Sequence, residues 1–81
     1  MYSIEFSNES KKFLRKLDKH DVDIILNKVY SLRENPFRNL KRLHGEKLWR
    51  LRIGDYRAIV DVLVSNNKIF VVRIGKRSRV Y

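Results

Sequence analysis

Arginine side chains recur at alternate positions on either side of a glycine-containing turn in the middle of the chain. Residues 47–57 read Lys-Leu-Trp-Arg-Leu-Arg-Ile-Gly-Asp-Tyr-Arg, so two alternating runs flank a Gly-Asp pair. Glycine at the first central position suits a type II′ turn between antiparallel strands. Counting from this turn sets Arg52 opposite Arg57 and Leu51 opposite Ala58. Because like charges directly opposite each other destabilise a sheet, we interpret the arginine pair as a site for an anionic ligand.

The two faces of the predicted hairpin differ in chemistry. One face carries apolar and aromatic residues, which we interpret as the side toward a hydrophobic core: Trp49, Leu51, Ile53, Tyr56, Ala58 and Val60. The other face carries three arginines: Arg50, Arg52 and Arg57.

A third strand is predicted to extend the basic face. The Ser-Asn-Asn sequence at residues 65–67 is typical of a turn. We expect the strands on either side of this turn to set Asp61 opposite Arg73, a favourable pair of charges. The same register sets Arg57 opposite Arg77. The sequence therefore predicts one row of guanidinium groups across three strands: Arg52, Arg57 and Arg77.

Such a row suits the phosphodiester backbone of RNA. Guanidinium groups form charge-assisted, often bidentate hydrogen bonds to phosphate oxygens, and an aromatic residue such as Tyr81 can stack on an unpaired base. RNA also carries its own nucleophile, the 2′-hydroxyl. An enzyme can cut RNA without a metal by aligning that hydroxyl with phosphorus and stabilising the charge that develops. The alternative interpretation is a solvated basic face that binds no ligand.

Other kinds of chemistry find little support in the sequence. There is no cysteine, glycine-rich phosphate loop or zinc-ligand spacing, so we expect no metal and no cofactor. His20 is expected to be solvated. His44 and Glu46 lie near the basic hairpin and are candidates for an acid–base group, the alternative being loop residues without a role.

Composition indicates a polyanionic partner. The formal net charge is +10, and a strongly basic chain of this kind is typical of nucleic-acid binders or of proteins masked by an acidic partner. The first residues do not resemble a signal peptide, and no apolar run approaches membrane-spanning length. We therefore expect a cytoplasmic protein that makes no membrane contact.

The pattern of apolar residues predicts which elements hold this hairpin. We expect one domain over residues 1–81 with an α+β fold, in which an antiparallel sheet packs against an N-terminal helical hairpin. The element order is β-α-α-β-β-β. The expected segments are a strand at 2–6, a helix capped by Ser7 or Asn8, a second helix ending at Asn35-Pro36, a loop at 37–45, the hairpin strands, and a last strand at 69–74.

Two stretches of the sequence resemble the RelE family of toxins in bacterial and archaeal toxin–antitoxin pairs. They are residues 49–57, which contain the hairpin, and residues 75–81, which read Gly-Lys-Arg-Ser-Arg-Val-Tyr. The likeness covers nearly the whole chain in element order, and it is more specific to the RelE/ParE superfamily than to one of its branches. The resemblance implies an antiparallel sheet against two helices and cleavage of mRNA in the ribosomal decoding site.

The resemblance also implies roles for individual residues. Arg57 matches a phosphate-binding arginine, Arg77 an arginine that stabilises charge near the scissile phosphate, and Tyr81 a tyrosine that stacks on the substrate. Arg52 completes the expected catalytic set. The residues expected to bind RNA beside them are Lys47, Arg50, Lys76 and Arg79.

Arg50 and Arg52 stand where the best-known RelE has lysines. A guanidinium, with a pKa above about 12, is a poor general base. Either another group accepts the proton, or the site works mainly by electrostatics and alignment. The candidate groups are Lys47, Lys76, His44 and Glu46.

The partners implied by the resemblance are the ribosome with its mRNA and a RelB-like antitoxin wrapped around the toxin. Operator DNA would be contacted only through the antitoxin complex. Two alternatives stay open: a ParE-like gyrase inhibitor on the same scaffold, and a catalytically degenerate module that binds only its antitoxin and DNA.

Overall fold

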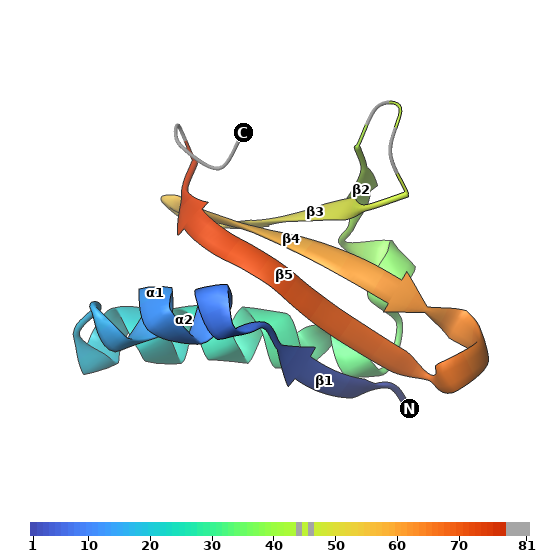
Figure 1. Ribbon diagram of the computed structural model, residues 1–81, viewed down its shortest axis with the longest axis horizontal. Coiled ribbons are helices and arrows are strands. Elements are labelled where there is room, and N and C mark those ends of the chain that lie inside the picture. The colour runs from blue at the N-terminus through green and yellow to red at the C-terminus, as the bar shows by residue number, and fades with distance from the viewer. Residues whose placement is uncertain (44, 46, 78–81) are drawn as a thin grey trace.

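A computed structural model of the protein describes residues 1–43, 45 and 47–77. In these residues two antiparallel helices cover one face of a twisted five-stranded sheet (Figure 1). The elements are β1 (Ser3–Phe6), α1 (Asn8–Arg15), α2 (Lys19–Tyr30), β2 (Lys41–Arg42), β3 (Trp49–Ile53), β4 (Tyr56–Leu63) and β5 (Lys68–Lys76), with short 3-10 turns η1 (Ser31–Arg33), η2 (Pro36–Arg38) and η3 (Val64–Asn66). The expected α+β fold is confirmed.

The strand order is β1-β5-β4-β3-β2, and every neighbouring pair is antiparallel except β1 with β5. The expectation of a loop over residues 37–45 was wrong in part. Lys41 and Arg42 pair with Arg50 and Trp49, so this segment adds a short edge strand, β2. No helix among the described residues is long and apolar enough to cross a bilayer.

The helices begin where polar side chains cap them. Ser7 is the N-cap of α1, where its hydroxyl accepts a hydrogen bond from the Ser10 amide at 3.0 Å. Asp18 caps α2 in the same way through the Asp21 amide at 2.9 Å. Such caps satisfy amides that a helix leaves without partners. The second helix ends at Tyr30, which is earlier than the predicted end at Asn35-Pro36. The chain continues as the tighter turn η1.

The hydrophobic core lies between the helices and the sheet. Its fully buried side chains include Ile25, Val29, Leu32, Leu51, Val60, Ile69 and Val71. Trp49 was expected in this core; it is half-buried and packs against the core cluster from β3, beside the edge strand β2. There the Phe37 ring meets it edge-on at 5.1 Å, and the Arg42 guanidinium lies 5.5 Å from its ring centre.

The predicted register of the hairpin is confirmed. Arg52 pairs with Arg57 and Leu51 with Ala58. Gly54 has a φ of 55°, a left-handed value that a type II′ turn requires at its first central position. The turn therefore aligns the two arginines directly across from each other.

The predicted register of the last strand was wrong. Asp61 pairs with Phe70 instead of Arg73, and Arg57 pairs with Gly75 instead of Arg77. The ladder already differs beside the turn, because Leu63 pairs with Lys68, whereas the predicted register would pair it with Val71. Farther along there is a β-bulge: Val60 pairs with Val71 and Ile59 pairs with Arg73, which leaves Val72 as an extra residue on β5. A bulge of this kind changes which face the later side chains occupy.

Contacts from the first helix hold the bulge. The Ser7 hydroxyl donates a hydrogen bond to the Val72 carbonyl at 2.6 Å. The Ser10 hydroxyl, which is fully buried, donates to the Val71 carbonyl at 3.0 Å, and the Ser7 amide donates to the same carbonyl at 3.0 Å. Backbone groups that the irregular ladder would leave without partners are thus satisfied by α1.

Candidate nucleic-acid interface

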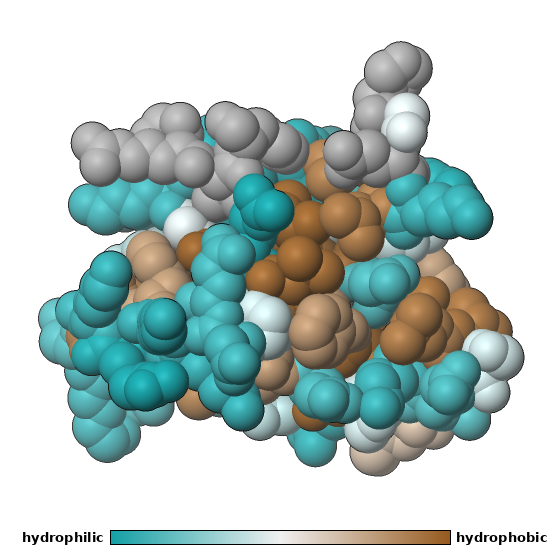
Figure 2. All heavy atoms as spheres, viewed as in Figure 1, coloured by the Kyte–Doolittle hydropathy of each residue, from teal (hydrophilic) through white to brown (hydrophobic). Residues whose placement is uncertain are grey.

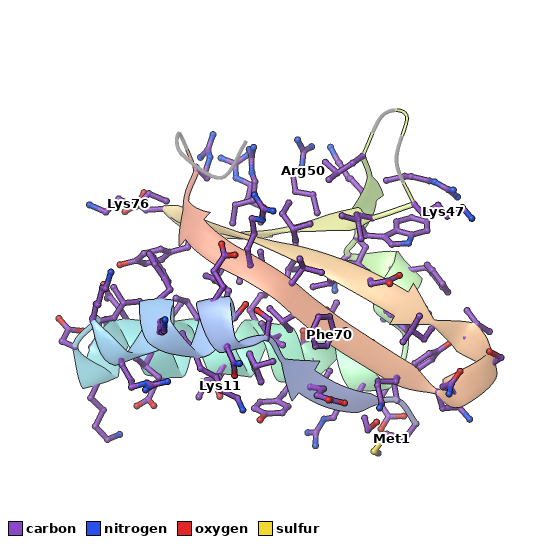
Figure 3. All side chains as sticks on the ribbon, in the orientation of Figure 1. Met1, Lys11, Lys47, Arg50, Phe70 and Lys76 are labelled. Atoms are coloured by element: carbon purple, nitrogen blue, oxygen red, sulfur yellow. The ribbon has the colours of Figure 1, made fainter. Side chains whose placement is uncertain are left out.

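Six cationic residues lie close together on the sheet face opposite the helices, and we call this set the basic face. Its members follow from the strand registers: Lys41, Arg50, Arg52, Arg57, Arg73 and Arg77. Figure 3 shows Arg50 pointing away from the helical layer. Arg50 and Arg57 are half-buried, and the other four are exposed. Lys68, on the same sheet face, lies at the far end of β5 and forms an ion pair with Glu5.

The basic face is arranged in two rows that cross the strands. The inner row runs Arg52, Arg57, Gly75, so the predicted row ends on a glycine, and Arg77 lies two residues farther along the chain. The Arg77 amide donates to the Asp55 carbonyl at 3.0 Å, which extends the ladder to this residue. The outer row runs Lys41, Arg50, Ile59, Arg73. Each row contains one pair of like charges directly opposite each other, an arrangement that costs stability.

Arg57 separates two hollows in the surface. The smaller hollow has a volume of about 100 Å³ and is lined by Asn39, Lys41, Arg50, Arg52 and Arg57. The larger is an open depression of about 700 Å³ lined by Asp21, Asp55, Tyr56, Arg57, Lys76 and Arg77. The small hollow has room for a compact anion and is surrounded by guanidinium and ammonium groups, the donors that suit phosphate oxygens.

A tyrosine fixes the end of the hairpin against the helices. The Tyr56 hydroxyl donates a hydrogen bond to Oδ2 of Asp21 at 2.7 Å, and the Phe13 ring meets its ring edge-on at 6.0 Å. The hydrogen bond to Asp21 is the main cause that raises the pKa of Tyr56 to about 12; burial and the charges of Asp21, Asp18 and Asp55 add to it. Tyr56 is therefore a protonated donor at neutral pH, and it holds the strand that carries Arg57.

Other predicted site residues lie apart from the basic face or outside the described residues. Lys76 pairs with Tyr56 at the helix-facing side of the sheet end, but it lines the larger hollow with Arg57. Lys47 is exposed just before β3, as Figure 3 shows. The remaining candidates lie outside the described residues: His44, Glu46, Arg79 and Tyr81.

Sequence reasoning missed two members of the basic face, Lys41 and Arg73. Lys41 was assigned to a loop, and Arg73 was paired with Asp61. The position of Arg73 depends on the bulge, which is held by serines more than 60 residues away. No local signal in the last strand reveals it. Within the described part of the chain, no three histidine, cysteine or carboxylate side chains come together as a metal site.

A family model described as the ParE toxin of the parDE type II toxin–antitoxin system matches residues 4–81. The chain belongs to this toxin family, within the RelE/ParE superfamily. None of the curated proteins matches this toxin significantly in sequence.

Solved structures of RelE toxins share the fold of this toxin. The RelBE complex from E. coli is 26% identical with a TM-score of 0.79, covering 98% of this chain and 100% of that chain. The RelE–RelB complex from Pyrococcus horikoshii is 26% identical with a TM-score of 0.83, covering 96% and 97%. The RelBE2 complex from Mycobacterium tuberculosis has a TM-score of 0.86 at 22% identity, covering 94% and 98%.

Proposed function

We propose that this toxin is a ribosome-dependent endoribonuclease that cuts mRNA in the decoding site. The observation that carries the proposal is the Arg52–Arg57 pair, two cations directly opposite each other beside a small hollow. Like charges directly opposite each other on a sheet are unfavourable, and a phosphate group between the guanidinium groups would be attracted to both. The similarity to RelE toxins of solved structure supports the same conclusion.

The proposed chemistry uses the substrate's own nucleophile. The 2′-oxygen of RNA bonds to the adjacent phosphorus while its proton passes to a base. The bond from phosphorus to the 5′-oxygen breaks, and the departing 5′-oxygen takes up a proton, which leaves a 2′,3′-cyclic phosphate and a 5′-hydroxyl. Arg52, Arg57 and Arg77 stabilise the negative charge that gathers on the phosphorus oxygens, and their fixed positions make this effect large. Tyr81 stacks on a base, while the flanking RNA backbone is bound by Lys47, Arg50, Lys76 and Arg79.

Proton transfer is the step that the basic face serves least well. Its arginines are poor bases because a guanidinium does not release its proton near neutral pH. We propose that alignment and charge stabilisation carry most of the rate, with Lys47, Lys76, His44 and Glu46 as candidate acceptors. Tyr56 is not a candidate, because its raised pKa keeps the hydroxyl protonated.

The ribosome is needed because the basic face is open. The larger hollow is an open depression, and nothing among the described residues surrounds an RNA strand or forces it into an in-line geometry. Free RNA should therefore bind weakly, with a strong dependence on salt. The ribosome would supply the position and the conformation of the mRNA.

The test compares mRNA cleavage on programmed ribosomes with cleavage of the same RNA alone. We expect metal-independent cutting only with ribosomes, and a loss of about 100-fold or more in Arg57→Ala. Arg15→Ala, which removes an exposed arginine from the helical layer, serves as the charge-matched control and should cut at the wild-type rate. Efficient cutting of free RNA, or full activity in Arg57→Ala, would contradict the proposal.

An antitoxin is the proposed protein partner. The similar structures named above are complexes of RelE with RelB. Figure 2 shows hydrophobic surface over β5 bordered by hydrophilic side chains, where Phe70 and Val72 are half-buried. An antitoxin segment with acidic and apolar side chains would fit both this surface and the basic face. We propose that operator DNA is contacted only through that complex.

A second candidate function is inhibition of DNA gyrase. It is favoured by the family model, whose description names the ParE toxin. A supercoiling assay run beside the ribosome assay separates the two functions. Gyrase inhibition without mRNA cleavage would identify a ParE-like toxin, and inactivity in both assays with antitoxin binding retained would identify a degenerate toxin.

A further inference from the structure

The outer row of the basic face has no part in the chemistry proposed above, apart from Arg50. Lys41 pairs directly with Arg50, and the next positions across the sheet are Ile59 and Arg73. Ile59 is only 3% exposed yet lies outside the core cluster, so it forms an uncharged floor between cations on both sides. Lys41 and Arg73 are both exposed.

We propose that Lys41, Arg50 and Arg73 form a track that binds the phosphodiester backbone of RNA beside the cleavage site. This inference rests on the proposed function, because it assigns the track to RNA. The track would hold RNA that is not cut: either nucleotides of the mRNA next to the scissile bond or a segment of ribosomal RNA. Both present the same phosphate groups.

The size of the outer row fits a strand of backbone better than a single ion. Neighbouring strands lie about 4.8 Å apart, so three steps from β2 to β5 span roughly 14 Å. The outer row lies two residues along the strands from the inner row, about 7 Å away. RNA could therefore contact both rows at once, with different phosphates on each.

Among the described residues, the carboxylates on this side of the sheet lie outside the two rows. Glu5 pairs with Phe70 and forms an ion pair with Lys68. Asp61 is two residues beyond Ile59 on β4 and pairs with Phe70, and Asp55 lies in the turn opposite Arg77. Neither shares a cross-strand pair with Lys41, Arg50 or Arg73. The bulge at Val72 contributes as well, because the ladder without it would set Arg73 opposite Ala58 on the core face. The fold thus contains an irregularity whose result is one more cation on the basic face.

The test measures affinity as a function of salt for two RNA ligands. One is an unstructured RNA oligonucleotide, and the other is ribosomes without mRNA. Arg73→Ala and Lys41→Ala should each weaken binding to at least one ligand by roughly threefold to tenfold, and should lower the slope of log K against log salt by about 0.7 to 1. Arg73→Lys should keep most of the affinity. Arg15→Ala removes the same charge from the other layer and should change neither quantity.

The pattern of losses identifies the RNA. A loss with the oligonucleotide assigns the track to mRNA, and a loss only with ribosomes assigns it to ribosomal RNA. If Arg73→Ala and Lys41→Ala match Arg15→Ala with both ligands, the track does not exist, even if the wild-type toxin cuts mRNA. If they weaken binding while the wild-type toxin fails to cut mRNA on ribosomes, the proposed catalytic function fails and the track remains.

Discussion

At the scale of single residues, the position of Arg57 concentrates the proposed function. It pairs with Arg52, lines both hollows and lies opposite Gly75 on the last strand. Its strand is held by Tyr56, the neighbouring residue, through the hydrogen bond to Asp21. The Arg57 guanidinium is therefore a positive charge on a strand that is held in place, and fixed charges of this kind can stabilise a transition state.

Removing an exposed member of the arginine pair should affect activity much more than stability. Arg52→Ala removes repulsion with Arg57 and little packing, so the free energy of unfolding should change by no more than about 0.5 kcal/mol. Cleavage of mRNA on ribosomes should fall by roughly 100-fold. Denaturation and cleavage rates on the same variant check both values.

Leu51→Ala provides the contrast on the same strand. Leu51 is fully buried, so its truncation should lower the free energy of unfolding by about 2–5 kcal/mol. If Arg52→Ala is destabilised to a similar extent, the arginine pair is structural and the assignment of the inner row is wrong.

The Tyr56–Asp21 hydrogen bond should make the stability depend on alkaline pH. The pKa of Tyr56 is raised from 10.0 to about 12 in the folded state. A group with a raised folded pKa contributes stability that is complete below the unfolded pKa and is lost as pH rises through the folded one. The stability difference between wild type and Tyr56→Phe should therefore be constant up to about pH 10 and shrink between about 10 and 12. Urea denaturation at several pH values measures it, and a difference that grows over this range would refute the hydrogen bond.

At the scale of elements, the hairpin could be predicted and the bulge could not. The two-residue turn fixes the pairing of β3 with β4 by counting, because every side chain alternates and one face is apolar. In β5, Ile69 to Val72 are all apolar, so alternation gives no register. The position of the bulge depends on Ser7 and Ser10, which meet β5 only in the folded protein. The position of Lys41 on an edge strand could not be predicted either, because a strand of two residues is too short to show an alternating pattern.

Removing the buried hydroxyl that contacts the bulge should be costly. Ser10→Ala deletes the donor to the Val71 carbonyl, and the loss of a buried hydrogen bond should lower the free energy of unfolding by about 1–3 kcal/mol. Ser65→Ala is a suitable control, because Ser65 is exposed and its hydroxyl bonds only the neighbouring Asn66 side chain in the described structure. Chemical denaturation of both variants provides the comparison. Equal stability would show that α1 does not hold the bulge.

At the scale of the whole molecule, a net charge of +10 on 81 residues favours binding of polyanions but lowers the stability of the fold. Self-repulsion destabilises a compact state, and a domain of this size has a small core to oppose it. The basic face collects six of the cations on one surface without interleaved carboxylates in its rows. An acidic partner covering this face would therefore relieve repulsion across the molecule.

The antitoxin should accordingly act as a folding ligand. A partner that binds only the folded toxin adds about 2.7 kcal/mol of stability when its free concentration is a hundred times its Kd. Titration of the cognate antitoxin should raise the melting temperature and abolish mRNA cleavage together. The rise should shrink at high salt if the basic face supplies much of the affinity. An unchanged melting temperature at saturating antitoxin would contradict this prediction.

The pairing of β1 with β5 has a consequence for the cell that makes this protein. Residues 3–6 lie beside residues 68–71 and have no other strand neighbour. The strand β1 therefore cannot pair with the sheet until β5 has been synthesised. The start of α1 also depends on β5, because the hydroxyls of Ser7 and Ser10 donate hydrogen bonds to carbonyls of that strand. A chain ending at Asn67 should therefore show no cooperative unfolding transition in denaturant. Translation that stops early would release a fragment without a formed basic face, so under the proposed function only a chain that includes β5 could cut mRNA.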